Sequence, residues 1–271
     1  MLGELLDFDL SQIKPLSSGT KFGFSNSNHQ SLSNFMKFDL PLFTRLITGF
    51  ALWLGLALVT TSCQKEDSDS VAQDRIYVDY SLIYDKAQDK TYARAAFKFG
   101  STTGTQLELK APSEVRFGND VMTFVPLVNY YEKTFAGQQT QGTFTFKDLD
   151  GKTYVNNIGG LVPAELPASF TNLSKGSAYT VTWDGPPVRA NEVLDVTVDG
   201  AGQSDPIQVF LQSGVGATEV VLEANRIGLL LNGPAQAVIN RSLLLPLQQG
   251  SSAGGTLLTR YQGQGKTVPV Q

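Results

Sequence analysis

Apolar and polar residues alternate through most of the chain after residue 75, and turn-forming residues separate the alternating runs. In the run 76–84, for example, Ile76, Val78 and Tyr80 fall on one side. Successive side chains of a β-strand point to opposite faces, so this period of two predicts strands with one face in a core and the other in water. No amphipathic helix pattern lies between the runs, and the sequence therefore predicts an all-β fold.

A stretch rich in glycine and proline at residues 159–163 separates two sets of predicted strands, because both residue types interrupt strand pairing. Each set occupies about 100 residues, which is the size of one β-sandwich. We therefore expect two sandwich domains, at residues 74–160 and 161–271.

Cys63 is the only cysteine, and it follows the apolar run 46–59. That run is shorter than the roughly 20 residues that span a bilayer, but it fits the apolar core of a secretion signal. Lys37 and Arg45 precede the run and supply the positive charge of a signal peptide. Lipoprotein signals usually have an aliphatic residue three places before the cysteine, and Thr60 stands at that position here. The order resembles a bacterial lipoprotein signal peptide, which implies that Cys63 is acylated and becomes the mature N-terminus. An ordinary signal peptide or a short anchor that contains a cysteine is the alternative.

The segment before this leader has acidic residues that are unusual in a signal peptide, and Met36 begins a more typical leader. We therefore expect residues 1–35 to be a misassigned translation start or a disordered extension, and residues 36–62 to be the signal peptide. Residues 63–73 would be the lipidated cysteine and a flexible tether, long enough to hold the folded body up to about 35 Å from the membrane.

Two further segments resemble features of surface lipoproteins from the Bacteroidota. Lys65-Glu66-Asp67 resembles the Lys-acidic-acidic signal for the outer face of the outer membrane, although a plain solvated tether would have the same composition. Residues 179–185, Tyr-Thr-Val-Thr-Trp-Asp-Gly, resemble a strand and turn of the immunoglobulin-like domains in such proteins. The resemblance implies two immunoglobulin-like β-sandwiches, anchored by lipid in the outer membrane and exposed at the cell surface.

Composition excludes several classes of function. The chain has a net charge of −4, whereas nucleic-acid binding requires clustered Lys and Arg. The sole histidine, His29, lies in the leader region, and Cys63 is expected to carry lipid. Neither a Ser-His-Asp or Cys-His nucleophile nor an ordinary zinc site can then be built from the mature chain. Paired carboxylates and oxygen-liganded calcium remain possible chemistries, and we expect no cofactor.

Three aromatic residues are candidate ligand-binding residues. Tyr130 and Tyr131 are adjacent in a predicted strand, so one of them should point to solvent, where it could contact a glycan or a peptide. A half-buried strand tyrosine is the alternative. Trp183 could be a platform for a sugar ring, but it shares a strand face with Tyr179 and Val181, which favours a place in the core.

Four aspartates are weak candidates for calcium binding. Asp148 and Asp150 resemble the start of a calcium loop, but a Glu at the twelfth position is required and Gly159 stands there. The Asp-Gly pair at 150–151 also fits a tight hairpin turn. Asp195 and Asp199 lie on the predicted solvent face of one strand, where solubility is a simpler reason for their presence.

These observations favour a non-enzymatic, membrane-anchored surface lipoprotein that serves in ligand binding, adhesion or scaffolding, with a protein or a glycan as its ligand. The alternative is a carbohydrate-binding or carbohydrate-active lipoprotein of a polysaccharide-uptake system. The alternative predicts a groove lined by Tyr or Trp, with two carboxyl groups about 5–10 Å apart if the protein hydrolyses the glycan.

Overall fold

The fold was analysed in a computed structural model, which describes residues 65–202 and 206–271. The predicted extension 1–35, the predicted signal peptide 36–62 and Cys63 lie outside the described residues. The described residues all belong to one compact unit. Its described part consists mainly of strands, with one α-helix, α2 (Ala224–Ile227), and two 3-10 turns, η3 (Ser68–Ser70) and η4 (Gln73–Arg75). The prediction of an all-β fold is therefore confirmed.

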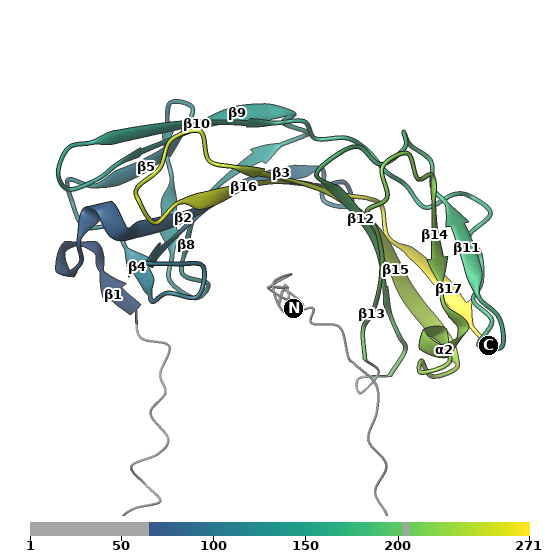
Figure 1. Cartoon of the computed structure of the whole chain (residues 1–271). Helices are drawn as coiled ribbons and strands as arrows, with labels where there is room; N and C mark the ends of the chain where they lie inside the picture. The colour runs from purple at the N-terminus through teal and green to yellow at the C-terminus, as the bar shows by residue number, and fades with distance from the viewer. Residues whose placement is uncertain (1–64, 203–205) are drawn as a thin grey trace, which may run out of the picture. The chain divides into compact units, whose positions relative to one another are not determined.

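The largest sheet, called the long sheet below, has eleven strands (Figure 1). Eight of them follow one another in the order β1 (Lys65–Asp67), β4 (Gln106–Glu108), β3 (Lys90–Phe99), β2 (Ile76–Asp85), β16 (Gly255–Gln262), β15 (Gly233–Pro246), β12 (Glu192–Asp199) and β13 (Gln208–Gln212). Three more strands pair beside this path: β8 (Tyr130–Ala136) with β3, β7 (Thr123–Val125) with β8, and β17 (Lys266–Val270) with β15. The pairs β2–β16 and β1–β4 are parallel, and the other pairs are antiparallel.

Two smaller sheets complete the fold. The first has the order β10 (Thr153–Gly159), β9 (Gln141–Lys147), β5 (Glu114–Phe117) and β6 (Asp120–Val121). The second consists of β11 (Tyr179–Thr182) and β14 (Glu219–Leu222). Each of them contributes buried residues to a core that it shares with the long sheet.

The first core lies between the four-stranded sheet and strands β2, β3 and β16. Its centre is aromatic: the rings of Tyr80 and Phe144 stack with centroids 4.5 Å apart, and those of Phe97 and Phe146 are 4.7 Å apart. All four side chains are almost fully buried, and such aromatic pairs contribute beyond the area that they bury. The alternating apolar residues of β2 and β9 therefore form the interior that their spacing predicts.

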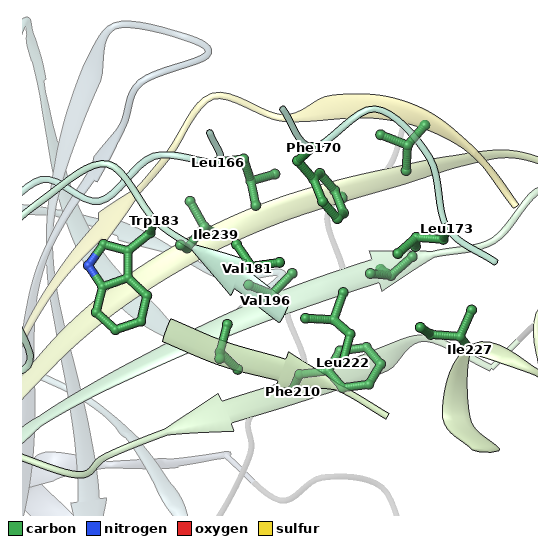
Figure 2. Packing of buried hydrophobic residues seen from close by; sticks show 14 of the residues in the cluster. Leu166, Phe170, Leu173, Val181, Trp183, Val196, Phe210, Leu222, Ile227 and Ile239 are labelled. Carbon is green, nitrogen blue, oxygen red and sulfur yellow. The ribbon is translucent and has the colours of Figure 1, made fainter. Parts of the chain in front are cut away.

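The second core lies between strands β12, β13, β15 and β17 of the long sheet and the two-stranded sheet (Figure 2). Val196 of β12 and Ile239 of β15 face Val181 of β11 and Leu222 of β14 across this core, and all four are buried. The irregular segment after residue 163 adds further buried side chains, among them Phe170. Burial of apolar surface is thus the common source of stability in both cores.

Both cores lie on the same face of the long sheet. Leu245 of β15 packs against the first core, and Ile239 of the same strand belongs to the second. The two residues are six positions apart, an even number, so they point to one face. Strand β16 pairs with β2 and adds Leu257 to the first core. The division into sandwich domains at 74–160 and 161–271 stays a prediction. Strand β16, from the second segment, is paired with β2 of the first.

The expected flexible tether is wrong from Lys65 onward. Residues 65–67 pair with β4, and Ser68 and Gln73 are buried. The Gln73 amide donates hydrogen bonds to the Ser68 and Val71 carbonyls, at 2.6 and 3.0 Å, while the Ser68 hydroxyl accepts one from the Lys110 N–H at 2.9 Å. Polar composition indicated a solvated linker, but hydrogen bonds to the body order this segment without apolar side chains.

Candidate functional site

The face of the long sheet opposite the two cores is the largest candidate surface, and we call it the open face. In Figure 1 no strand or helix of the described part of the chain lies over it. Cross-strand register places residues from several strands side by side: Tyr92 of β3 pairs with Ile83 of β2, Ile83 with Arg260 of β16, and Arg260 with Ser242 of β15. All four side chains are partly exposed. The open face is therefore a continuous surface across these strands.

One end of the open face carries an arginine held between two tyrosines, which we call the Arg94 cluster. The Arg94 guanidinium lies 5.0 Å from the ring centroid of Tyr92 and 4.9 Å from that of Tyr130. Arg94 also donates a hydrogen bond from Nε to Glu132 Oε2 at 2.7 Å, across the β3–β8 pair. Cation–π contacts of this kind are attractive and modestly stabilise the position of a guanidinium. The cluster is a preorganised surface of two rings, one cation and one carboxylate.

Both phenols of the Arg94 cluster remain protonated at neutral pH. Burial raises the pKa of Tyr92, and the charges of Asp85 and Glu132 raise it further against the opposing effect of Arg94. Burial also raises the pKa of Tyr130, an effect that Arg94 opposes and Glu132 supports. Each hydroxyl can therefore donate and accept a hydrogen bond, while the rings supply apolar area. Such a combination suits a polar ligand with flat apolar patches, such as a peptide or a sugar ring.

A second polar group lies farther along the open face. Asp195 of β12 accepts a hydrogen bond from Asn240 Nδ2 of β15 at 2.7 Å and another from the Thr197 hydroxyl at 3.1 Å. Burial raises the pKa of Asp195, and the hydrogen bonds and the charge of Arg260 oppose that rise. Arg260 itself donates from Nε to the Ser242 hydroxyl at 3.0 Å. These contacts account for Asp195 without a calcium ion.

Of the three aromatic residues predicted to bind ligand, only Tyr130 lies on the open face. Tyr131 points into the first core, where its hydroxyl accepts a hydrogen bond from the Leu109 N–H at 2.7 Å and its ring packs edge-on against Phe97. Trp183 is only 4% exposed, and its indole N–H donates to the Pro186 carbonyl at 3.2 Å. The prediction that Tyr131 and Trp183 bind a ligand is therefore wrong, because neither ring can reach a ligand in solution.

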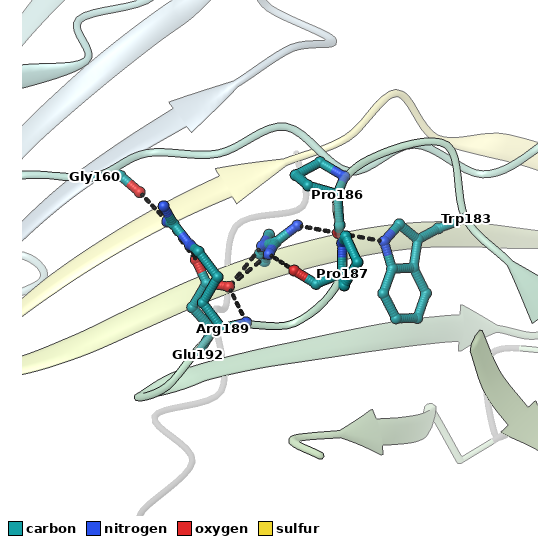
Figure 3. Close-up of polar contacts among 7 residues, drawn as sticks. Gly160, Trp183, Pro186, Pro187, Arg189 and Glu192 are labelled. Carbon is teal, nitrogen blue, oxygen red and sulfur yellow. Dashed lines mark hydrogen bonds and ion pairs between the residues drawn. The ribbon is translucent and has the colours of Figure 1, made fainter. Parts of the chain in front are cut away.

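Trp183 borders a buried ion pair that the sequence analysis missed (Figure 3). Arg241 and Glu192 lie on the core face of β15 and β12, and their side chains are 2% and 1% exposed. Arg241 donates to Glu192 Oε2 at 2.5 Å and to the carbonyls of Pro186 and Pro187 at 2.7 and 2.6 Å. Glu192 shares its strand face with buried Leu194, and Arg241 shares its face with buried Ile239. A charged residue on an otherwise apolar strand face is the sequence signal that could have predicted this pair.

Glu192 is ionised in this environment. Burial alone would raise its pKa, but hydrogen bonds from Arg189 and Arg241 outweigh burial and lower the pKa below its ordinary value. Arg189 is half-exposed and also donates to the Gly160 carbonyl at 3.2 Å. The ion pair thus ties β12 and β15 to the loop after Trp183 and to the segment that connects the two sets of strands, which is a structural role.

The remaining calcium candidates do not converge. Asp148 is buried at the β9–β10 hairpin, where it accepts a hydrogen bond from the Lys152 N–H at 2.8 Å, while Asp150 lies in the exposed turn and Asp199 is exposed at the end of β12. Within residues 65–202 and 206–271, no group of three or more His, Cys, Asp or Glu side chains could hold a metal ion. Asp148 therefore acts as a turn residue.

A shallow hollow of about 460 Å³ lies at the start of the described chain. Its lining is partly acidic and comes from the 3-10 turns and the β9–β10 hairpin: Asp69, Val71, Ala72, Gln73, Asp74, Leu149 and Asp150. Neither Tyr nor Trp lines it, so it lacks the aromatic walls that the carbohydrate-active alternative predicts.

The predicted export signal forms the edge strand β1. Lys65 makes an ion pair with Glu108, and its Nζ lies 4.5 Å from the ring centroid of Phe124. Asp67 pairs with Lys110 at 3.0 Å, while Glu66 is exposed. Cys63, the predicted lipidation site, lies outside the described residues. Among the helices that the structure describes, none has the length and apolar character to cross a bilayer.

Comparisons with known proteins leave the family unassigned. No family model and no curated protein matches the chain. Among solved structures, the chain is similar to trypsin-activated alpha-2-macroglobulin from Escherichia coli, with 11% identity and a TM-score of 0.21 over 72% of this chain and 15% of that one. It is also similar to a Salmonella alpha-2-macroglobulin mutant, with 10% identity and a TM-score of 0.20 over 70% of this chain and 14% of that one. The chain thus spans only about a seventh of either protein, and the likeness is too low to assign a fold family.

Proposed function

We propose that this chain is a surface lipoprotein of the outer membrane, anchored through acylated Cys63, that acts by binding a ligand rather than by catalysis. The observation that carries the binding role is the open face, on which the Arg94 cluster offers rings and charges held in place by one another. A fold that places both cores on one face of its longest sheet leaves the other face to contact a partner. Exposed Leu211 and Leu244 add apolar area to this surface.

The anchoring role rests on the sequence around Cys63. Metabolic labelling with a radioactive fatty acid should label the wild-type chain in a bacterial host, and the label should be absent from a Cys63→Ser variant. Fractionation should then find the wild type with the membranes and the variant in the soluble fraction. A protein whose Cys63→Ser variant stays equally membrane-bound, with no label in the wild type, would contradict the anchor.

The binding role is tested on the soluble compact unit, residues 60–271 with Cys63→Ser. Arg94→Ala removes the central cation of the cluster, and Arg116→Ala is a matched control, because Arg116 is also partly exposed and pairs with Glu114 at 2.9 Å on another sheet. In a capture screen against surface proteins and in a glycan array, Arg94→Ala should lose the ligand that the wild type and the control retain. Equal binding by all three proteins would exclude the Arg94 cluster as the binding surface.

A carbohydrate-binding role is the second candidate, and it is favoured by one specific observation. Tyr92 and Tyr130 flank Arg94 with partly exposed rings, and aromatic rings beside polar groups are suited to sugar rings. Selective binding to one polysaccharide in the glycan array, lost in a Tyr130→Ser variant, would support this role over protein binding. Cleavage of the bound polysaccharide by the wild type would contradict the non-enzymatic proposal.

A further inference from the structure

The turn between β7 and β8 exposes three consecutive apolar residues, Pro126, Leu127 and Val128, which we call the apolar tip. A hydrogen bond from the Val128 N–H to the Val125 carbonyl at 3.2 Å closes the turn. Leu127 is 93% exposed, more than any other large apolar residue of the described chain. Pro126 is usual at the second position of such a turn, but the next positions favour Gly, Asn, Asp and Ser. Leu127 and Val128 depart from this preference, and an exposed apolar run points to a function.

The apolar tip lies at the same end of the long sheet as the start of β1. Through the β1–β4–β3 pairing, Lys65 is level with Lys98 near the end of β3. Tyr131 of β8 pairs with Ala95 of β3, and the β7–β8 hairpin extends from that level toward the Lys98 end before it turns. The Lys65 Nζ lies 4.5 Å from the Phe124 ring of β7, so the hairpin and β1 are in contact.

The short segment between Cys63 and β1 limits how far the apolar tip can lie from the membrane. Cys63 precedes Lys65 by two residues, which span at most about 7 Å when extended. An acyl chain on Cys63 buries its carbons in the leaflet, so β1 must lie within about that distance of the lipid surface. Four charged residues of this edge are paired, Lys65 with Glu108 and Asp67 with Lys110. The pairing lowers the cost of placing these charges near the lipid surface.

We propose that the apolar tip inserts into the lipid interface beside acylated Cys63, so that this end of the long sheet is docked on the membrane. This inference rests on the proposed lipid anchor. The occupant is the lipid leaflet itself, because a cysteine two residues from β1 brings the leaflet to this edge of the fold. Membrane docking gives the exposed Leu127 a burial site, and it fixes the folded body close to the leaflet rather than on a long tether.

The test uses the full chain, acylated in a bacterial host and reconstituted into phosphatidylcholine vesicles. Leu127→Cys adds a thiol at the apolar tip, and acylation of Cys63 leaves it as the only free one for an environment-sensitive fluorophore such as NBD. Val215→Cys is the matched control, because Val215 is a 73% exposed apolar turn residue between β13 and β14, at the far end of the strand order. Mass spectrometry first confirms the acyl group on each variant.

We expect the label at position 127 to shift to shorter wavelength on reconstitution and to be quenched several-fold by nitroxide-labelled lipid, with little change at position 215. An acylated, vesicle-bound protein whose two labels respond equally weakly would overturn the docking of the apolar tip and leave the lipid anchor intact. Equally strong responses at both positions would also overturn it, since insertion would then not be specific to this edge. A chain without an acyl group that stays off the vesicles would overturn the anchor and the docking together.

Discussion

Replacement of the buried Arg241 tests how strongly its ion pair with Glu192 stabilises the fold. In an Arg241→Met variant, Glu192 keeps its charge in a site that is 1% exposed but loses its buried partner. The carbonyls of Pro186 and Pro187 lose their donors as well. Breaking one side of a buried ion pair costs about 3–5 kcal/mol, because the remaining charge is left without full compensation.

Arg189 reduces that cost but cannot remove it. Its backbone N–H, Nε and Nη2 still donate to Glu192 at 2.7, 2.8 and 2.5 Å. We therefore expect Arg241→Met to destabilise by about 3 kcal/mol, the lower end of the range. The same contacts give a matched control. Arg189→Met removes a half-exposed partner of the same carboxylate, and because solvent can partly replace a half-exposed partner, we expect a smaller loss than for Arg241→Met.

Urea unfolding of residues 60–271 with Cys63→Ser, followed by circular dichroism, measures these differences. With a slope of about 2–3 kcal/mol per M, a loss of 3 kcal/mol lowers the midpoint by about 1–1.5 M. The double variant Glu192→Leu with Arg241→Met should recover most of the loss, since apolar residues of similar size can replace a buried pair. The reasoning would be refuted by an Arg241→Met midpoint no lower than that of Arg189→Met, or by a double variant less stable than Arg241→Met.

Three further predictions concern stability. Glu192→Gln should reduce the loss of stability in acid. The pKa of Glu192 is lower in the folded protein than its ordinary value of 4.5, so its carboxylate contributes stability above pH 4.5 that is lost as the pH falls through the folded pKa. Urea midpoints between pH 5 and 3 should therefore fall less in the variant than in the wild type. Asp195→Asn should show the opposite sign, because a raised pKa costs stability once the carboxyl ionises; the variant should be more stable than the wild type at pH 7, and an equal or lower midpoint there would contradict this. Gly142→Ala should destabilise by about 1–3 kcal/mol, because the added Cβ would lie 1.9 Å from the Phe117 ring; Gly176→Ala, with no neighbour within 4 Å, is the control, and equal thermal midpoints for both variants would contradict the prediction.

The sequence was least informative where a segment is short and its composition fits two states. Residues 65–73 are polar enough for a linker, yet backbone pairing with β4 orders them, together with hydrogen bonds from the Lys110 N–H to Ser68 and from the Leu149 N–H to Gln73. The apolar run at residues 227–231 predicts a strand, and this prediction is wrong. The structure ends α2 at Ile227 and buries Ile227 and Leu230, while Leu229 is exposed. In both segments, long-range contacts decide a conformation that local propensity leaves open.

The candidate site shows the same division. The adjacency of Tyr130 and Tyr131 predicted that one ring points to solvent, since neighbouring strand residues face opposite ways. Which of the two is exposed depends on the pairing of Tyr131 with Ala95, whose face lies on the first core. In the sequence, Arg94 is only a polar residue between two alanines. Its place between two tyrosine rings exists because β8 lies beside β3.

Alternation in the sequence was sufficient to predict an all-β chain and the core-facing side of strands such as β2 and β9, because the side-chain period of a strand is a local property of its backbone. The order of the strands in the sheet could not be predicted from this alternation. The parallel pairing of β16 with β2 joins residues about 180 positions apart in the chain, and it places both cores on one side of a single sheet. Only the tertiary structure decided this, because the sequence of a strand shows which face is apolar but not which other strand will bind its edge.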